Sequence, residues 1–196
     1  MGLFLLTPVF LSNKAVKQAA ARAEGNREWG GMKMTLAQDM MAAVDGMQEE
    51  LVIGRRDLHR YPEPGWTEFR TAAKVAKALK ELGYEVAMGR EAVAEAAMMG
   101  RPSAEVLKAA QERAIEEGAD PALVAAMEGG FTGVVGTLRF EKPGPVVGLR
   151  FDMDSNDVQE TDDPKHFPNR EGFASVHDGA MHACGHDGHT TVGLAL

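Results

Sequence analysis

The stretch MHACGHDGHT, residues 181–190, contains three histidines, the single cysteine of the chain and a carboxylate. Cys184 and His186 are two positions apart, so in an extended segment their side chains leave the same face of the backbone. A thiolate and an imidazole that converge on one point suit a borderline-soft divalent cation such as zinc. The spacing therefore predicts half of a metal site, with Cys184 and His186 as ligands.

A mostly apolar run, PVVGLRFDM at residues 145–153, lies upstream of this motif and is followed directly by Asp154. Its pattern is typical of a central strand that is buried on both faces. Asp152 and Asp154 mark the C-terminal end of the run, and ligands bind at that end of the strands in open α/β sheets. The two carboxylates are either a solvated strand end or part of a site, and the motif that follows favours the site.

The remaining chain alternates between helical and strand-like patterns. Apolar spacing predicts a helix from Thr35, as its N-cap, into about residue 58, and a second helix from Thr67 that ends before Gly83. A short strand over residues 84–88 follows, then short helices inserted over residues 90–128, and a strand over residues 133–140. The insertion is either a structural feature or a partner surface, and its dispersed charge favours the structural reading.

Composition narrows the function classes. The net charge of −8 is dispersed, which argues against a nucleic-acid partner. The apolar run from Leu3 to Leu11 is too short to span a membrane, and a single cysteine favours a reducing compartment such as the cytoplasm. We interpret residues 1–33 as a poorly ordered N-terminal extension, with a signal peptide as the alternative.

Three stretches together resemble the M20 metallopeptidase family, in its amidohydrolase branch. HACGHDGHT at residues 182–190 resembles the metal-binding signature of that branch, and RFDMD at residues 150–154 resembles its Asp-Met-Asp strand end. RRDLHRYPEPGWTE at residues 55–68 resembles its N-terminal His-Pro-Glu segment. The similarity runs from roughly residue 34 to residue 196 and covers the first part of such an enzyme. The resemblance implies an α/β fold, with helices on both faces of a mixed sheet, as the N-terminal portion of a catalytic domain truncated at its C-terminus.

The resemblance also implies a chemistry. It is metal-dependent hydrolysis of the amide bond in a small N-acyl amino acid, with p-aminobenzoyl-glutamate as the favoured substrate and zinc or manganese as the metal. Cys184 and His186 match metal ligands, and Asp154 matches a residue that orients a ligand. Asp152 stands where other branches carry a ligand histidine, and His189 supports the loop. The general base, the remaining ligands and a lid domain that makes a dimer, in one form with a homologous second chain, are expected beyond residue 196. The chain alone is therefore expected to be inactive and poorly soluble.

Some alternatives remain open at this stage. A non-catalytic metal- or partner-binding module is the rival to an enzyme, although a structural zinc site needs four ligands and the chain has no second cysteine. His59 and Glu63 are either surface residues or border the metal cleft. His166 and His177 are expected at the surface.

Overall fold

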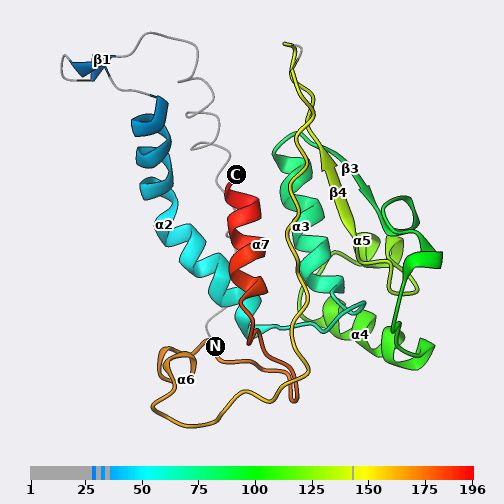
Figure 1. Ribbon diagram of the computed structural model, residues 1–196. Coiled ribbons are helices and arrows are strands. Elements are labelled where there is room, and N and C mark those ends of the chain that lie inside the picture. Colours follow the sequence, from blue (N-terminus) through cyan, green and yellow to red (C-terminus); the bar gives the residue numbers. More distant parts are fainter. Residues whose placement is uncertain (1–27, 30–31, 34–35, 143) are drawn as a thin grey trace, which may run out of the picture. The chain divides into compact units, whose positions relative to one another are not determined.

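The computed structural model describes residues 28–29, 32–33, 36–142 and 144–196 (Figure 1). Most of the predicted N-terminal extension, and the predicted cap at Thr35, lie outside these residues. Contacts between residues divide the chain into two compact units, one ending at Gly54 and one running from Arg55 to Leu194.

The first unit contains a two-stranded antiparallel pair and most of one long helix. β1 (Glu28–Trp29) pairs with β2 (Met32–Lys33), and α2 (Leu36–Arg60) begins here and ends in the second unit. The predicted helix is present. Two apolar residues of this helix, Met40 and Val44, are 59% and 51% exposed.

The second unit is a mixture of helices and short strands (Figure 1). In chain order its elements after α2 are α3 (Phe69–Glu81), β3 (Glu85–Met88), η1 (Gly89–Glu91), η2 (Glu95–Ala97), α4 (Ala104–Glu116), α5 (Pro121–Ala126), β4 (Val134–Thr137), α6 (Phe167–Glu171) and α7 (His186–Ala195). The helices predicted within residues 90–128 are confirmed as α4 and α5.

Local signals explain where these helices begin. The Ser103 hydroxyl accepts the N–H of Val106 at the start of α4. Asp120 caps α5, and Pro121 occupies its first turn, where the missing N–H has no helical partner to lose. Helices α3, α4 and α5 then bury a common core that includes Phe69, Ala72, Ala73, Leu107, Ala110, Ala114, Val124 and Met127.

The strands of the second unit form one antiparallel pair. β3 and β4 are joined in register from Glu85↔Thr137 to Met88↔Val134. Both sheets of the described residues are two-stranded and antiparallel, and with the helices they make an α/β fold.

The prediction of a buried central strand at residues 145–153 is wrong for the described chain. These residues form no strand (Figure 1), and Val146, Val147 and Leu149 are 100%, 73% and 68% exposed. No described segment pairs with the backbone of this run, so its apolar side chains have no sheet to pack within. The pattern specified a strand-like segment, but burial also needs neighbouring strands.

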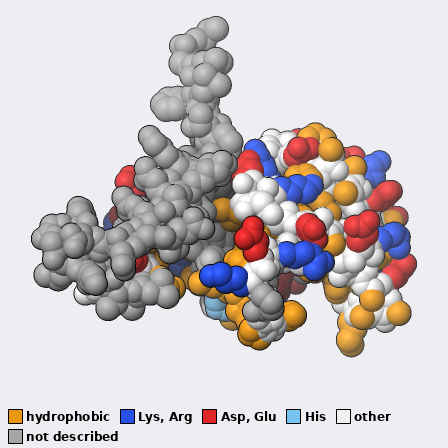
Figure 2. Space-filling view, turned by 90° about the horizontal axis from the view of Figure 1, so that it is seen from above, with side chains coloured by type: hydrophobic (Ala, Val, Ile, Leu, Met, Phe, Trp, Pro, Cys, Tyr) orange, Lys and Arg blue, Asp and Glu red, His pale blue; other side chains and the backbone are white. Residues whose placement is uncertain are grey.

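The surface carries both signs of charge. On the face shown in Figure 2, Lys and Arg side chains are interspersed with Asp and Glu side chains, and neither sign gathers in one region of the described residues. No described helix combines the length and the apolar character needed to cross a membrane.

Candidate metal centre

Backbone hydrogen bonds bring three distant segments together. The N–H of Ser155 donates to the carbonyl of Glu63 over 2.8 Å, which joins the turn after α2 to the segment after the apolar run. Asn156 and Met181 exchange N–H···O bonds of 3.0 and 3.1 Å, which place the 181–190 motif beside the same segment. The sequence stretches that carry the family resemblance therefore meet in space.

Three potential metal ligands gather at this meeting point. Asp152, His186 and His189 each offer one ligand atom, and these atoms lie within 4.8 Å of one another. His189 Nδ1 is 2.6 Å from Asp152 Oδ1, and His186 Nε2 is 3.7 Å from Asp152 Oδ2. The bond from His189 is the main reason why the pKa of Asp152 lies below its usual range. The two imidazole rings are stacked, with centroids 5.4 Å apart.

The orientation of His186 is fixed by Asp154. His186 Nδ1 lies 2.8 Å from the carbonyl oxygen of Asp154 and 3.1 Å from its Oδ1. Both oxygens are acceptors, so Nδ1 carries the proton and donates to them. In the neutral ring the lone pair is then on Nε2, the nitrogen nearer to the Asp152 carboxylate. This tautomer is the one that can bind a metal at Nε2.

Cys184 is exposed, and its thiol is not part of the three-ligand group found among the described residues. The segment is not extended, because Gly185 has φ +108° and α7 begins at His186. The geometric premise that placed Cys184 and His186 on one face of an extended segment therefore does not hold. The grouping of His189 with His186 was missed for the same reason, since residues three apart lie on one face only in a helix.

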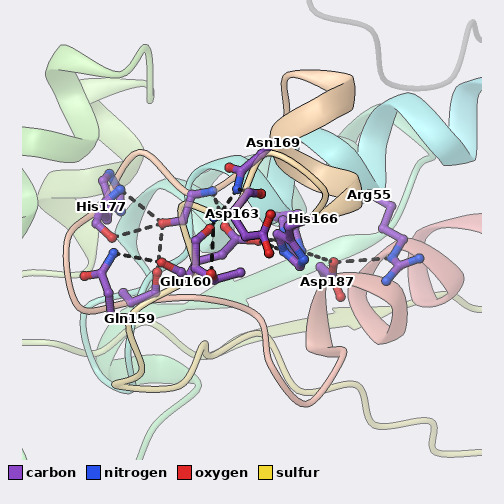
Figure 3. A network of polar contacts seen from close by, with 12 residues as sticks. Arg55, Gln159, Glu160, Asp163, His166, Asn169, His177 and Asp187 are labelled. Carbon is purple, nitrogen blue, oxygen red and sulfur yellow. Dashed lines mark hydrogen bonds and ion pairs between the residues drawn. The ribbon is translucent and has the colours of Figure 1, made fainter.

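Asp187, which follows His186 in α7, belongs to a polar network with Arg55 (Figure 3). Asp187 lies in the first turn of α7 and is 1% exposed, and His59 from α2 is 7% exposed. His59 Nδ1 lies 3.0 Å from Asp187 Oδ2, and its Nε2 lies 3.0 Å from Glu160 Oε1. Arg55 donates to Asp187 from the solvent side over 3.3 Å.

The charges of this network follow from its geometry. Burial lowers the pKa of His59, but the hydrogen bonds to Asp187 and Glu160 outweigh burial and raise it overall. Burial raises the pKa of both carboxyls, but the bonds they accept hold each below its usual range. Each nitrogen of His59 faces an ionised acceptor, so both nitrogens donate and His59 is an imidazolium between two carboxylates.

Further contacts extend the network through the loop before the motif. Glu160 also accepts from His166 Nε2, at 2.8 Å, and from the backbone N–H of Ser175. The ring of His177 lies between the Pro62 carbonyl and the Glu117 carboxylate, at 2.7 and 2.6 Å. The prediction of a surface position is therefore wrong for His177, whose side chain is 8% exposed, and His166 is half-buried. Glu160, which no sequence motif singles out, connects His59 with His166.

Other titratable groups are buried close by. Glu63 is fully buried and accepts the N–H groups of Arg70 and Thr71, so it caps the first turn of α3. Burial raises the pKa of Glu63 and of Glu68 to about 7 in each case. His182 is 6% exposed, and neither of its ring nitrogens has a hydrogen-bond partner among the described protein atoms. Burial lowers the pKa of His182 to about 4, which keeps its ring neutral near pH 7.

The chain is similar to known proteins in sequence and in structure. No protein-family profile matches the chain. The chain is 52% identical over 153 residues to one of the subunits of p-aminobenzoyl-glutamate hydrolase from Escherichia coli (strain K12), covering 78% of this chain and 35% of that protein. It is 52% identical over 147 residues to indole-3-acetyl-aspartic acid hydrolase of Enterobacter agglomerans, covering 75% and 34%.

More distant relatives extend this result. Thermostable carboxypeptidase 1 of Saccharolobus solfataricus is 31% identical over 159 residues, covering 81% of this chain and 29% of that protein. The crystal structure of an aminobenzoyl-glutamate utilization protein from Klebsiella pneumoniae matches with a TM-score of 0.63 and 38% identity, covering 79% and 33%. This chain spans about a third of the length of the curated relatives it matches. The structural match confirms the α/β fold class.

Proposed function

We propose, from the similarity of this chain to amide hydrolases and its resemblance to the amidohydrolase branch of the M20 metallopeptidase family, that the protein is a metal-dependent hydrolase of N-acyl amino acids. Two relatives at 52% identity are named for conjugates that join an aromatic acyl group to an acidic amino acid. This shared chemistry favours p-aminobenzoyl-glutamate as the substrate, which hydrolysis converts to p-aminobenzoate and glutamate.

The grouping of Asp152, His186 and His189 is the observation that carries the proposal. Two imidazoles and a carboxylate are a donor set used by catalytic zinc sites, which keep a further position open for water or substrate. Zinc or manganese bound there would polarise the scissile carbonyl and lower the pKa of a bound water.

The residues of the chain itself prepare this site. Asp154 accepts the proton-bearing nitrogen of His186 and so fixes the tautomer whose Nε2 lone pair is free. Asp187, the next residue along α7, is held by His59 and Arg55. The first turn of α7, which carries His186, is thereby anchored to α2 by one buried and one partly buried hydrogen bond. These contacts support a preorganised site that needs little rearrangement to accept an ion.

Two ligand sets share His186. The family resemblance pairs it with Cys184, and the geometry of the described residues groups it with Asp152 and His189. We propose that His186 is a ligand in either case, and that metal content of single variants distinguishes the two sets.

The test uses metal analysis of the whole protein after purification. His186→Ala should lose most of the bound metal, because both ligand sets need it. Loss in Cys184→Ser with retention in His189→Ala favours the Cys184 set, and the reverse result favours the Asp152 set. Asp154→Asn should keep most of the metal but lower glutamate release from p-aminobenzoyl-glutamate on the order of 10–100-fold. Alanine at His166, which touches Glu160 rather than the cluster, is the control. Equal metal content in all these variants would contradict the ligand assignment.

The rival function is a non-catalytic metal- or partner-binding module. A protein that binds metal through His186 but releases no glutamate with saturating zinc or manganese would support that rival. The Escherichia coli relative is named as one subunit of its enzyme, which supports the further proposal that this protein forms a dimer with a homologous second chain. Sedimentation of the whole protein with and without such a partner tests the assembly.

A further inference from the structure

A cavity of about 570 Å³ lies within the second unit, and no residue of the three-ligand cluster lines it. Its walls are the turn at residues 64–67, the segment before α4, one face of α4, and Asp157. Trp66, Met99 and Val106 give it large apolar surfaces. A volume of this size suits a small molecule rather than a macromolecular segment.

Two opposite charges line the cavity without pairing. Arg113 and Asp157 both contribute to its wall, yet the described residues provide no salt bridge or side-chain hydrogen bond to either. The Nε of Arg113 is buried and has no partner. This atom is closed off from the cavity, so a ligand would meet the terminal nitrogens of the guanidinium, which no acidic side chain of the described residues pairs. An unpaired guanidinium on a cavity wall favours an anionic group there.

Other arginines of this unit show the contrast. Arg70 is paired with Asp57 at 2.8 Å, and Arg90 and Arg101 both contact Glu95, at 2.8 and 3.1 Å. Arg113 is therefore unusual among its neighbours, and its unpaired state coincides with its place on a cavity wall. Charge complementarity points to a ligand that carries a carboxylate.

The backbone of another wall segment is held in a strained conformation. Trp66 has φ +67°, and among the described residues it is the sole non-glycine with a positive φ. This conformation is unfavourable for an L-residue with a side chain, and such strain gathers at ligand sites. The Trp66 indole is fixed by a 2.7 Å hydrogen bond from Nε1 to the Met99 carbonyl. A Cβ on Gly130 would come 3.0 Å from the Trp66 carbonyl oxygen, so glycine there leaves room for the strained turn.

We propose that this cavity binds a free amino acid with an apolar side chain. The guanidinium of Arg113 receives the carboxylate, Asp157 receives the ammonium group, and Trp66, Met99 and Val106 contact the side chain. An aromatic carboxylic acid shares the carboxylate and the apolar body but lacks the ammonium group, so Asp157 distinguishes the two ligand sources. This inference does not depend on the proposed amide hydrolysis, because binding is measured without turnover.

The test is a titration of the whole protein by calorimetry with L-phenylalanine, benzoate and phenethylamine. L-phenylalanine should bind most tightly, and Arg113→Gln should weaken it by about tenfold or more through loss of a charge-assisted hydrogen bond. Asp157→Asn should weaken L-phenylalanine but leave benzoate unchanged. Lys108→Gln is the matched control, because Lys108 is on the same helix, pairs with Glu112 and does not line this cavity.

The variants should fold, since Arg113→Gln removes no polar contact that the described residues make. Circular dichroism melts check this, and Arg113→Lys, which keeps the charge, should retain part of the affinity. Unchanged affinity for L-phenylalanine in folded Arg113→Gln overturns the site. Benzoate that binds as tightly as L-phenylalanine, with no effect of Asp157→Asn on either, overturns the assignment to an amino acid.

Discussion

Two regions of the molecule depart from the usual rule that charged side chains are exposed and apolar side chains are buried. They are the network around Asp187 and the run at residues 145–153. Asp187 is 1% exposed although it is charged, whereas Val146 is 100% exposed although it is apolar. The difference lies in partners. The Asp187 carboxylate meets His59 and Arg55, which compensate for its loss of water. The backbone around Val146 meets no neighbouring strand in the part of the chain that the structure describes. In both regions, the polarity of a side chain is therefore not enough to decide whether that side chain is buried.

Removing the centre of the buried network should cause the largest loss of stability. Asp187→Leu should destabilise the protein by about 3–5 kcal/mol, because it leaves the His59 imidazolium buried with one carboxylate fewer. Urea denaturation of the variant and of the parent protein measures the change.

The control for Asp187→Leu is an exposed ion pair. Glu171→Ala removes a contact with Arg170 in which the Arg170 and Glu171 side chains are 60% and 37% exposed, and it should cost no more than about 1 kcal/mol. A loss below about 1 kcal/mol for Asp187→Leu would mean that burial of the charge needs no partner. That result would remove the physical basis of the comparison.

A change of pH should affect the stability of the same network less than Asp187→Leu does. The raised pKa of His59 means that its contribution to stability is complete below 6.5 and is lost as pH rises through the raised value. The lowered pKa values of Asp187 and Glu160 mean that their contributions are complete above 3.8 and 4.5, and are lost as pH falls through the lowered values. The network should therefore stabilise the fold most between about 4.5 and 6.5.

Glu63 and Glu68 titrate in the same pH range, but a rise in pH changes their contribution to stability in the opposite direction from that of Asp187 and Glu160. Their pKa of about 7 lies above the usual 4.5, so their contributions also decline as pH rises across that range. His59→Gln separates the effects. The variant should lose the decline in unfolding free energy above pH 6.5 that comes from His59 and keep the part due to the two glutamates. Identical pH profiles for both proteins would show that His59 does not change its charge on unfolding.

Sequence reasoning succeeded where the signal is local. The short helices predicted within residues 90–128 are present as α4 and α5, and the cap at Ser103 that starts α4 acts within one helical turn. The meeting of the Asp152–Asp154 segment with the 181–190 motif was expected from the family resemblance, and the hydrogen bonds from His186 to Asp154 bear out their proximity.

The predictions that failed depend on contacts between residues far apart in the chain, or on the local path of the backbone. The burial of His59 depends on contacts with Glu160 and Asp187, which are more than a hundred residues away along the chain. The positions of Cys184 and His189 relative to His186 depend on the left-handed conformation of Gly185 and on where α7 begins. Sequence spacing does not contain that information, because the same residues in an extended segment would place a different pair of side chains on one face.

The smallest expected effect tests the exposed side of the comparison. Val146→Thr should change the unfolding free energy by no more than about 0.5 kcal/mol, because a side chain that is 100% exposed loses no packing. The same substitution at Val124, which is 1% exposed in the core of α3, α4 and α5, should cost about 1–3 kcal/mol, because it replaces a buried methyl group with a hydroxyl inside an apolar core. Val146→Thr should also reduce aggregation of the chain, since it interrupts an exposed apolar run, and light scattering of matched samples measures this. If Val146→Thr costs as much as Val124→Thr, the run is buried in solution against something that pairs with it. The strand predicted at residues 145–153 would then exist, and burial in both regions would follow from the same rule, that a segment is buried when its backbone and its side chains both find partners.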